Sequence, residues 1–333
     1  MSTSTNPMLV LAIDVGGTQI KMGLVERSGR LLDTIYARTP SDSPPEQIVR
    51  LLFDLSNQLM ERNALPRPVI DGVGISLAGF ITSDGIVTAT AHLSRQWIGY
   101  DLKQRLLQEW QTSYYFALDT PAPTVGEYYY GAGRGIDDLV YVTVSTGIGA
   151  GIIANGRYFT GGLGWAGGVG HTIIDETSPS ICEGCSNHGC LETFAARQGI
   201  VSAAREAVVA NPDSQILRLA GGDMDRITPR LVSEAAQAGD LVAGQVFRQA
   251  GHALGIGLTN LVDIVAPRRV IIGGGIAQAG EILLEPVRQV IQQRAFPPQL
   301  RQVEVVQAAL GDLSGMFGAA ALVFFDLNIN PGD

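Results

Sequence analysis

The residues that could do chemistry in this sequence lie beside short glycine turns. The first turn interrupts an apolar stretch, Leu9 to Val25, which reads LVLAIDVGGTQIKMGLV. This pattern predicts two strands joined at Gly16 and Gly17. The two glycines let backbone N–H groups approach an anion, while Thr18 can donate from its hydroxyl and Asp14 can hold a metal-bound water. The same turn is also typical of an ordinary hairpin, so its role depends on what accompanies it.

The pattern occurs a second time, which favours a nucleotide site. Leu139 to Ala154 reads LVYVTVSTGIGAGIIA, and in an alignment of the two stretches Gly17 corresponds to Gly147. A third glycine turn follows the apolar residues Val270 to Ile272. Two related hairpins can hold phosphates, and a third glycine turn lets a flat base approach the backbone. The candidate contacts in the second and third turns are Thr146, Gly147, Gly273, Gly274 and Gly275.

A carboxylate suited to proton transfer follows another predicted strand. Residues Tyr114 to Leu118 are apolar and favour a strand, and Asp119 comes directly after them. Transfer of a phosphoryl group to an alcohol requires a carboxylate that accepts the hydroxyl proton from a rigid position. A single Asp after a strand is more often a turn or cap residue. From these residues alone Asp119 is therefore a candidate general base and not an assigned one.

The three cysteines of the chain lie together in the segment CEGCSNHGC, which begins eleven residues after His171. Three thiols and an imidazole at this spacing predict a tetrahedral zinc site, with reduced structural thiols as the alternative. Because such a site leaves no position for water, the metal would be structural and would clamp the loop around it. His188 within the segment is a rival ligand. The predicted ligands are His171, Cys182, Cys185 and Cys190.

The elements that must position these residues follow from periodicity and from Pro and Gly signals. Helical spacing of apolar residues predicts helices at 46–62, 102–110, 229–238, 241–265 and 281–294, with Asp101 as an N-cap. Short β-forming runs predict strands at 31–37, 69–75, 114–118, 270–272 and 303–306. The predicted order of elements is a mixture of strands and helices along the whole chain.

Together, the glycine turns are similar to those of the actin-like ATPase fold, which actin, heat-shock chaperones and sugar kinases share. More narrowly, the chain resembles the ROK family of bacterial repressors, open reading frames and sugar kinases, from about Leu9 to about Phe325. The resemblance implies an α/β protein with a two-lobed actin-like ATPase (ribonuclease H-like) fold and a cleft between the lobes. The expected small lobe spans residues 8–120 plus 314–327, and the expected large lobe spans 121–313.

The resemblance also implies ATP with Mg²⁺ as the phosphate donor, a sugar as the acceptor and a homodimer as the assembly. The segment LDTPAPTVGEYYYGAG resembles the family's catalytic stretch and places Asp119 at the catalytic carboxylate. An ordinary strand-end turn at 76–79 and a first-turn helix carboxylate at Glu192 are the alternatives to sugar contacts there. The implied sugar contacts are Ala78, Gly79, Asp119, His171 and Glu192.

Some positions depart from the family pattern. Leu118 and Pro121 stand where the pattern has Asn, and Gly168 stands where it has Glu. Cys182 is displaced by one residue. Leucine cannot replace the hydrogen bond of an Asn, and each hydrogen bond to a carboxylate contributes about 1.5 to 3 kcal/mol. These departures raise the alternative of a shifted substrate or of lost turnover.

Composition sets limits on the function. The 333 residues suit two domains, and 41 glycines predict many turns. A net charge of −9 argues against a nucleic-acid partner. Because only MSTSTNPM precedes the first turn, we expect no DNA-binding domain and no signal peptide. No apolar run is long enough to span a bilayer, so we expect a cytoplasmic protein.

Three functional hypotheses follow from these residues. The first is an ATP-dependent kinase for a hexose or hexose derivative, supported by the glycine turns and Asp119. The second is a sugar- or nucleotide-binding protein without kinase activity, motivated by Leu118, Pro121 and Gly168. The third is a structural zinc protein that no longer binds nucleotide, in which the glycines would serve only as turns.

Overall fold

The computed structural model describes residues 9–66, 69–90 and 93–330 of the chain. Met8, the expected start of the first lobe, and the segment before it lie outside the described residues. The described residues form two compact units, each with its own five-stranded sheet. The first unit is made of the described residues in Met1–Gly135, Tyr158–Ala166 and Asp312–Asp333, and the second of those in Ile136–Arg157 and Gly167–Gly311.

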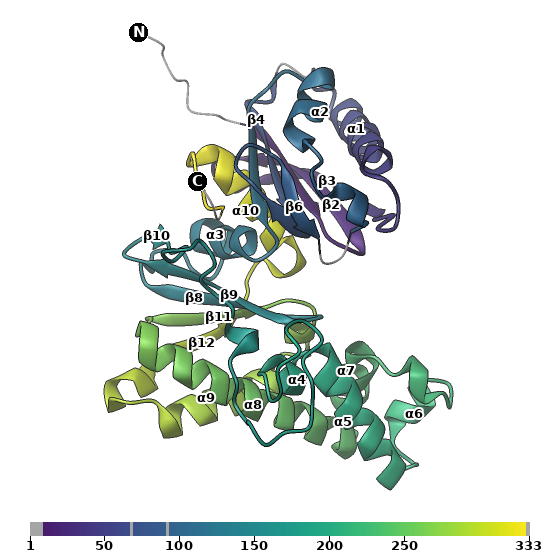
Figure 1. Cartoon of the computed structure of the whole chain (residues 1–333), viewed down its shortest axis with the longest axis vertical. Coiled ribbons are helices and arrows are strands. Elements are labelled where there is room, and N and C mark those ends of the chain that lie inside the picture. The colour runs from purple at the N-terminus through teal and green to yellow at the C-terminus, as the bar shows by residue number, and fades with distance from the viewer. Residues whose placement is uncertain (1–8, 67–68, 91–92, 331–333) are drawn as a thin grey trace. The chain divides into compact units, whose positions relative to one another are not determined.

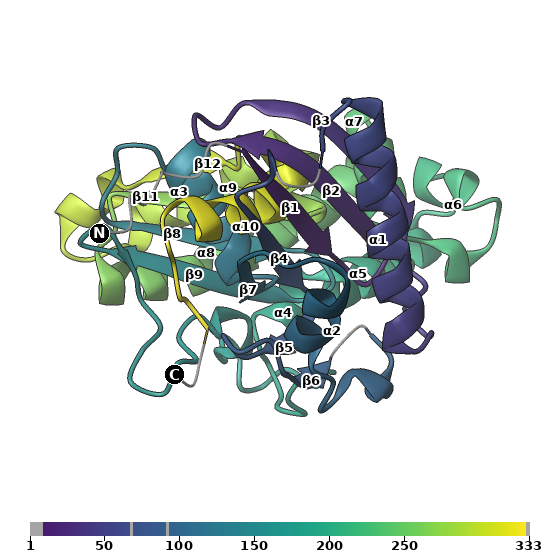
Figure 2. The same ribbon diagram turned by 90° about the horizontal axis from the view of Figure 1, so that it is seen from above.

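The sheet of the first unit has the strand order β3-β2-β1-β4-β7. The first three strands form the antiparallel meander seen in Figure 2, whereas β4 and β7 run parallel to β1. A two-stranded sheet of β5 and β6 accompanies it. The strands are β1 (Leu9–Val15), β2 (Gln19–Glu26), β3 (Leu31–Arg38), β4 (Gly72–Leu77), β5 (Gly79–Ile81), β6 (Val87–Thr90) and β7 (Tyr114–Leu118).

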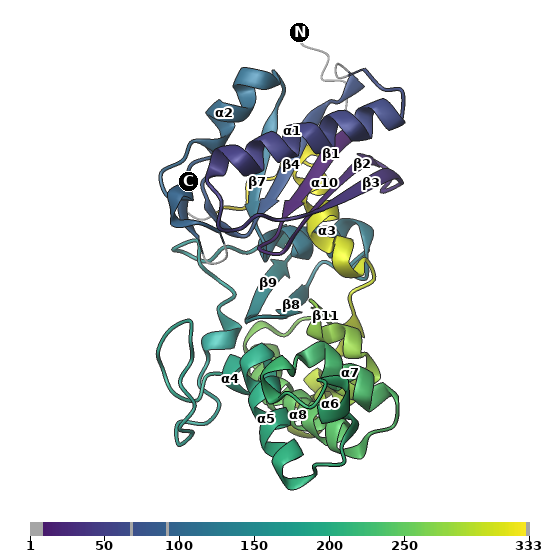
Figure 3. The ribbon, with the colours of Figure 1, turned by 90° about the vertical axis from the view of Figure 1, so that its right-hand side faces the viewer.

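Helices cover both faces of this sheet (Figure 3). One face carries α1 (Pro45–Arg62) and α2 (Leu102–Glu109), whose apolar residues are buried in one core with those of the strands. Pro45 at the first turn of α1 and Asp101 as the N-cap of α2 explain where these helices begin. The other face carries α10 (Ser314–Phe324), which packs against α3 (Pro121–Tyr130). The first unit therefore continues past residue 120 to Gly135.

The close approach of α10 to the sheet depends on a glycine in β4. A Cβ on Gly74 would lie 1.8 Å from the backbone oxygen of Ala319 in α10. We expect Gly74→Ala to lower the free energy of unfolding by about 3 kcal/mol, since backbone atoms must move to admit the methyl group. Urea unfolding of the variant measures this loss. Gly162→Ala is the control, because a Cβ there meets nothing within 4 Å, and an equal loss in both variants would contradict the packing explanation.

The sheet of the second unit has the order β10-β9-β8-β11-β12. Strands β8 and β9 are an antiparallel hairpin, and β11 pairs in parallel with both β8 and β12. The strands are β8 (Leu139–Val144), β9 (Ile148–Ala154), β10 (Arg157–Tyr158), β11 (Arg269–Gly273) and β12 (Glu304–Gln307). The helices are α4 (Glu192–Ala195), α5 (Arg197–Ala210), α6 (Gln215–Leu219), α7 (Pro229–Gln237), α8 (Leu241–Val265) and α9 (Glu281–Arg294).

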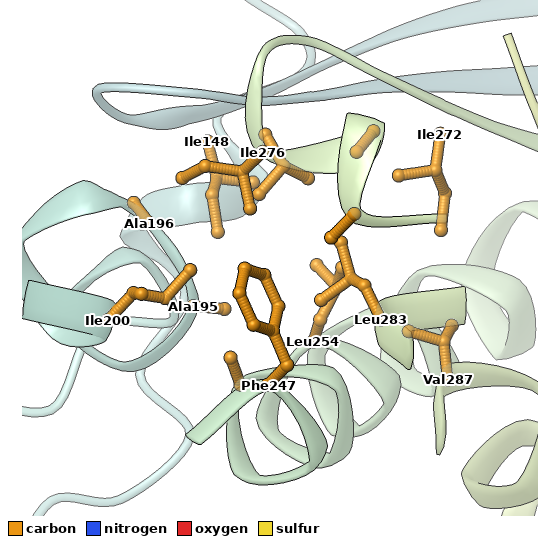
Figure 4. Close-up of a cluster of buried hydrophobic side chains, with 14 of the residues drawn as sticks. Ile148, Ala195, Ala196, Ile200, Phe247, Leu254, Ile272, Ile276, Leu283 and Val287 are labelled. Carbon is orange, nitrogen blue, oxygen red and sulfur yellow. The ribbon is translucent and has the colours of Figure 1, made fainter. Parts of the chain in front are cut away.

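The core of the second unit lies between its sheet and its helices (Figure 1). The ring of Phe247 of α8 lies between Ile200 of α5 on one side and Leu254 of α8 and Leu283 of α9 on the other (Figure 4). These side chains are fully or almost fully removed from water, which is the main favourable contribution to folding of this unit. The turns at the strand ends therefore follow strands that are buried in this core.

Most expected elements occur where the sequence places them. Strand β7 and helices α8 and α9 have the expected ranges, and the helix expected at 46–62 begins one residue earlier at Pro45. The strand expected at 69–75 is wrong at its start, because the Val69 N–H donates to the Pro66 carbonyl in a turn and β4 begins at Gly72. Among the described residues, none of the helices combines the length and apolarity that crossing a bilayer requires.

Candidate functional site

The first glycine turn joins β1 to β2 at the carboxyl end of β1. The Gly16 N–H donates to the Gln19 carbonyl at 3.1 Å and closes the turn. Thr39 braces it from outside, because its N–H donates to the Thr18 carbonyl at 2.9 Å and its hydroxyl to the Gly16 carbonyl at 2.7 Å. The exposed Thr18 and its neighbour Gly17 are left at the tip of a firmly held turn. This geometry suits the capture of an anion.

Asp14 lies beside this turn and is packed between neighbouring elements. It is opposite Lys21 in β2 and opposite Ser76 in β4, and a Cβ on Gly315 would lie 2.9 Å from its carboxyl carbon. Burial raises the pKa of Asp14, and the charge of Lys21 acts in the opposite direction. Lys21 also donates to the Asp312 carbonyl at 2.6 Å. The carboxylate is therefore fixed between the hairpin and the first turn of α10, where the helix dipole favours a negative charge.

The other candidate residues of the first unit lie at the same edge of its sheet. Ala78 and Gly79 follow β4, Asp119 follows β7, and both strands run parallel to β1. Because parallel neighbours end at one edge, the structure brings these residues and the first glycine turn to one region. The Ala78 N–H donates to the Val15 carbonyl at 2.8 Å, which ties the segment to β1. Asp119 is exposed, so its carboxylate is accessible to a substrate.

The second and third glycine turns lie at one edge of the sheet of the second unit, because each follows one of two parallel strands. The turn Ser145–Gly147 follows β8, and Gly273–Gly275 begins at the end of the parallel strand β11. Gly274 has φ +87°, and a Cβ there would lie 2.5 Å from the Val144 carbonyl oxygen. Only glycine fits this position, because its conformation is left-handed and it packs directly on the end of β8. Thr146 and Gly147 thus lie next to the third turn.

The Cys/His cluster is formed by His171, Cys182, Cys185 and Cys190 in the second unit. Their ligand atoms all lie within 4.8 Å of one another. The Cys182 Sγ is 3.5 Å from the His171 Nδ1, and the Cys185 Sγ is 3.5 Å from the Cys190 Sγ. A zinc ion with Zn–S bonds of 2.3 Å would have ligands about 3.8 Å apart in a tetrahedron. The donor set and its spacing therefore fit zinc.

The local backbone explains why these four residues meet. His171 ends a short 3₁₀ turn, Val169–His171, and Ile173 bridges to Cys190. The Cys182 N–H donates to the Asn187 carbonyl, and the Ser186 N–H donates back to the Cys182 carbonyl. His188 bridges to Ile181 and is not one of the four clustered residues. The arrangement favours His171 over His188 as the imidazole ligand.

The protonation of the thiols differs across the cluster. A hydrogen bond from the Asn187 backbone lowers the pKa of Cys185 to about 7, whereas burial raises the pKa of Cys182 to about 12. Burial also raises the pKa of Cys190. Thiolates are the form that binds metal, and a bound cation favours them strongly.

Glu192, the first residue of α4, lies against this cluster. Its Oε1 is 2.9 Å from the Cys182 Sγ, and its Oε2 accepts from the Ile148 N–H at 3.3 Å. Its side chain is 14% exposed, and that of His171 is 44% exposed. The structure therefore brings His171 and Glu192 together, and Glu192 makes contacts beyond the first turn of α4.

Two aromatic residues of the first unit, Phe80 and Trp165, form a contact that the sequence does not predict. The rings of Phe80 and Trp165 meet edge to face with centroids 4.9 Å apart. Phe80 follows Gly79 directly, and Trp165 is 57% exposed within the glycine-dense segment 156–170. An exposed Trp among glycines is the sequence signal that points to this residue, since such rings often line ligand sites. Its partner, far away in the sequence, has no comparable signal.

The model of the ROK family matches residues 10–324. This chain belongs to the ROK family. The match covers residues of both units. The ROK resemblance seen in the sequence is confirmed.

Proteins similar to this ROK chain include a repressor and a kinase. A xylose repressor from Caldicellulosiruptor bescii is 31% identical over 319 residues, which are 96% of this chain and 78% of the repressor. A glucokinase from Halalkalibacterium halodurans is 31% identical over 317 residues, 94% of each chain. The kinase and the repressor are equally similar to this ROK chain, so identity alone does not choose between their functions.

A solved structure confirms the fold. The ROK family glucokinase from Streptomyces griseus, crystallised with glucose and AMPPNP, is 32% identical and superposes with a TM-score of 0.80 over 94% of this chain and 98% of that one. The expected mixed α/β architecture, the actin-like ATPase fold, is thereby confirmed. The roles of individual residues in this ROK chain stay predictions.

Proposed function

We propose that this ROK protein transfers the γ-phosphoryl group of ATP to a hydroxyl of a hexose or hexose derivative, with Asp119 as the general base. The observation that supports this best is the common edge of the first sheet. There the glycine turn after β1, the segment Ala78–Gly79 after β4 and Asp119 after β7 follow three adjacent parallel strands. The proposed phosphate contact, the proposed sugar contact and the proposed general base thus follow adjacent strands of one sheet, which can hold them in fixed positions.

The nucleotide contacts are assigned to turns in each unit. In the first unit, Gly16, Gly17 and Thr18 offer backbone and hydroxyl donors to phosphate, and the fixed carboxylate of Asp14 suits a hydrated Mg²⁺. Mg²⁺ would supply charge neutralisation on the phosphates. In the second unit, Thr146 and Gly147 are assigned to phosphate and Gly273–Gly275 to the adenosine side.

The sugar contacts are assigned to Ala78, Gly79, Asp119, His171 and Glu192. In this proposal Asp119 accepts the proton of the attacking hydroxyl, and the other four residues contact the sugar ring. His171 can form a hydrogen bond with the sugar through its Nε2 while its Nδ1 faces the Cys/His cluster. A structural Zn²⁺ in this cluster would fix the loop that carries both His171 and Glu192.

A second candidate function is sugar or nucleotide binding without turnover. Leu118 is 9% exposed and pairs with Leu77, so it offers no hydrogen bond at the position next to Asp119. Gly168 carries no side chain, and a Cβ there would meet nothing within 4 Å. The relationship to repressors accords with this alternative. Homodimer formation, a cytoplasmic location and the absence of a nucleic-acid partner stay predictions of the sequence.

A coupled ADP-release assay with a panel of hexoses, N-acetylhexosamines and polyols tests the proposal. The kinase predicts ADP release that depends on one of these acceptors. If no acceptor in the panel gives ADP release but MgATP still raises the melting temperature, the result would favour a binding protein without kinase activity. The absence of both turnover and MgATP binding would leave the third hypothesis, a structural zinc protein.

The aromatic pair predicts a measurable effect on substrate affinity. Phe80 and Trp165 present an apolar ring edge beside Gly79, which suits the C–H face of a sugar or an apolar substituent on it. We expect Trp165→Ala to raise KM for the sugar about three- to tenfold while kcat changes little, because the ring contributes about 1 kcal/mol to binding. Phe159→Ala, an exposed aromatic in the same segment, is the control. Equal KM changes in both variants would contradict a specific role of Trp165.

A further inference from the structure

The edge of the first sheet that carries the glycine turn also receives the end of β3. Strand β3 pairs antiparallel with β2, and β2 pairs antiparallel with β1, so β3 and β1 run in the same direction and end at the same edge. Arg38 is the last residue of β3. It lies opposite Gln19, the residue that follows Thr18. Because residues directly opposite each other in an antiparallel pair are about 5 Å apart, Arg38 lies beside the turn.

Arg38 also lies on the face of the sheet that carries Asp14. Residues directly opposite each other on neighbouring strands share a face, and every second residue of a strand returns to that face. Lys21 is opposite Asp14, and Gln19 comes two residues before Lys21. Gln19 and its partner Arg38 are therefore on the same face as Asp14. An arginine and the carboxylate assigned to a hydrated Mg²⁺ thus border one glycine turn on one face of the sheet.

The guanidinium of Arg38 is available to a ligand. Arg38 is exposed, and within the described part of the chain its side chain has no hydrogen-bond or ion-pair partner. A hollow of about 320 Å³ lies beside it and is lined by residues 38–43, including Asp42, which forms no ion pair with Arg38 among the described residues. Lys21, by contrast, already donates to the Asp312 carbonyl. An unpaired guanidinium next to an anion-binding turn suits phosphate, because its fork of N–H groups matches phosphate oxygens.

The backbone that carries Arg38 is fixed to the turn. The next residue, Thr39, donates its N–H to the Thr18 carbonyl at 2.9 Å and its hydroxyl to the Gly16 carbonyl at 2.7 Å. Thr39 is only 4% exposed, so water competes little for these two bonds. The Cα of Arg38 therefore keeps a constant distance from the turn. Only the side chain of Arg38 has to be ordered when a ligand binds, which keeps the entropic cost of its contact small.

The order of the strand ends indicates which phosphate Arg38 would contact. Along the edge, Asp119 follows β7, Ala78 and Gly79 follow β4, the glycine turn follows β1, and Arg38 ends β3. The residues assigned to the acceptor thus lie on one side of the turn, and Arg38 lies on the other side. In phosphoryl transfer the attacking and leaving oxygens are roughly in line with the phosphorus. The leaving diphosphate therefore extends away from the acceptor, toward the end of β3.

We propose that Arg38 binds the β-phosphate of the nucleotide and stabilises the ADP that leaves. The proposal rests on the proposed function. In the transfer, the acceptor hydroxyl oxygen forms a bond to the γ-phosphorus, and its proton passes to Asp119. The bond between the γ-phosphorus and the bridging oxygen breaks, and this oxygen keeps the electron pair as part of ADP. Arg38 places a permanent positive charge beside the diphosphate on which this negative charge develops.

Nucleotide affinities test the assignment. The dissociation constants of MgADP and of AMPPNP with Mg²⁺ are measured by calorimetry on the full chain. We expect Arg38→Gln to bind both nucleotides about tenfold more weakly, because both carry the β-phosphate and lose a charge-assisted hydrogen bond. Arg38→Lys keeps the charge without the planar fork, so we expect a loss of only about threefold. Arg30→Gln is the matched control, since Arg30 precedes β3 at its other end and its side chain is 70% exposed.

Turnover supplies a second readout. We expect Arg38→Gln to lower kcat about tenfold at saturating MgATP and acceptor, because the leaving ADP carries more charge in the transition state than in bound ATP. An unchanged kcat would overturn the role of Arg38 in stabilising the leaving group. The melting temperature should match that of the wild type, because the exposed side chain holds no element in place.

The pattern of affinities separates the possible failures. Weaker binding of AMPPNP together with unchanged binding of MgADP would overturn the β-phosphate assignment, since the contact would then be to the γ-phosphate. Unchanged binding of both nucleotides to Arg38→Gln would overturn any phosphate contact of Arg38. A wild type that binds neither nucleotide would instead overturn the nucleotide assignment of the proposed function, on which this inference rests.

Discussion

Asp119→Asn is expected to lower kcat by about 10²- to 10⁴-fold, the usual contribution of a general base. The amide has nearly the same shape as the carboxylate but cannot accept the proton of a sugar hydroxyl during phosphoryl transfer. Asp119 follows β7 at the edge shared with the first glycine turn, so the change alters chemistry without disturbing the strand. The measurement is acceptor-dependent ADP release at saturating MgATP and sugar.

Two companion measurements separate catalysis from folding in this variant. The affinity for AMPPNP and the melting temperature of Asp119→Asn should stay close to those of the wild type, because Asp119 is exposed. Asp84→Asn changes another exposed aspartate of the first unit and should leave kcat unaltered. An undiminished turnover rate in Asp119→Asn would remove this residue from the mechanism.

Cys182→Ser is expected to abolish stoichiometric zinc binding and to lower the melting temperature by on the order of 10 °C. A metal whose dissociation constant is about a thousandfold below its free concentration stabilises the folded state by about 4 kcal/mol. The melting temperature of a domain of this size changes by about 2 to 4 °C per kcal/mol. The fold itself should persist, because the second unit has an extensive core apart from the cluster. Metal analysis and thermal unfolding with and without chelator measure both effects.

The two histidines near the cysteines provide a matched test of the ligand set. His171 belongs to the cluster, whereas His188 forms a backbone bridge with Ile181. We therefore expect His171→Ala to lose zinc and His188→Ala to retain it. The reverse result would show that the imidazole ligand is His188, and purified wild type without bound zinc, also after incubation with the metal, would support reduced structural thiols instead.

The parts of the fold that the sequence predicts are those with a strong local signal. Apolar periodicity gives α8 and α9 their full ranges, and a β-forming run bounded by polar residues gives β7. The start of β4 is missed because the turn at Pro66 removes Val69 from the strand. Local composition at Val69 favours a strand, but its N–H is bonded to the Pro66 carbonyl instead of to a neighbouring strand.

In the candidate site, too, the sequence predicts contacts within one segment and not contacts between distant segments. The Cys/His cluster is visible in the sequence because its ligands lie within twenty residues, and proximity along the chain enforces proximity in space. The contact between Phe80 and Trp165 and that between Glu192 and Ile148 join distant segments. Such contacts depend on the packing of whole elements, so no pattern within one segment could predict them.

The most direct test of the proposed kinase is detection of a phosphorylated sugar by mass spectrometry after incubation of zinc-loaded protein with MgATP and the acceptor panel. The account predicts that one acceptor or class of acceptors gains a single phosphoryl group with wild type, and that Asp119→Asn forms no detectable product. Binding of nucleotide without any phosphorylated acceptor would contradict the account and identify this ROK protein as a binding protein.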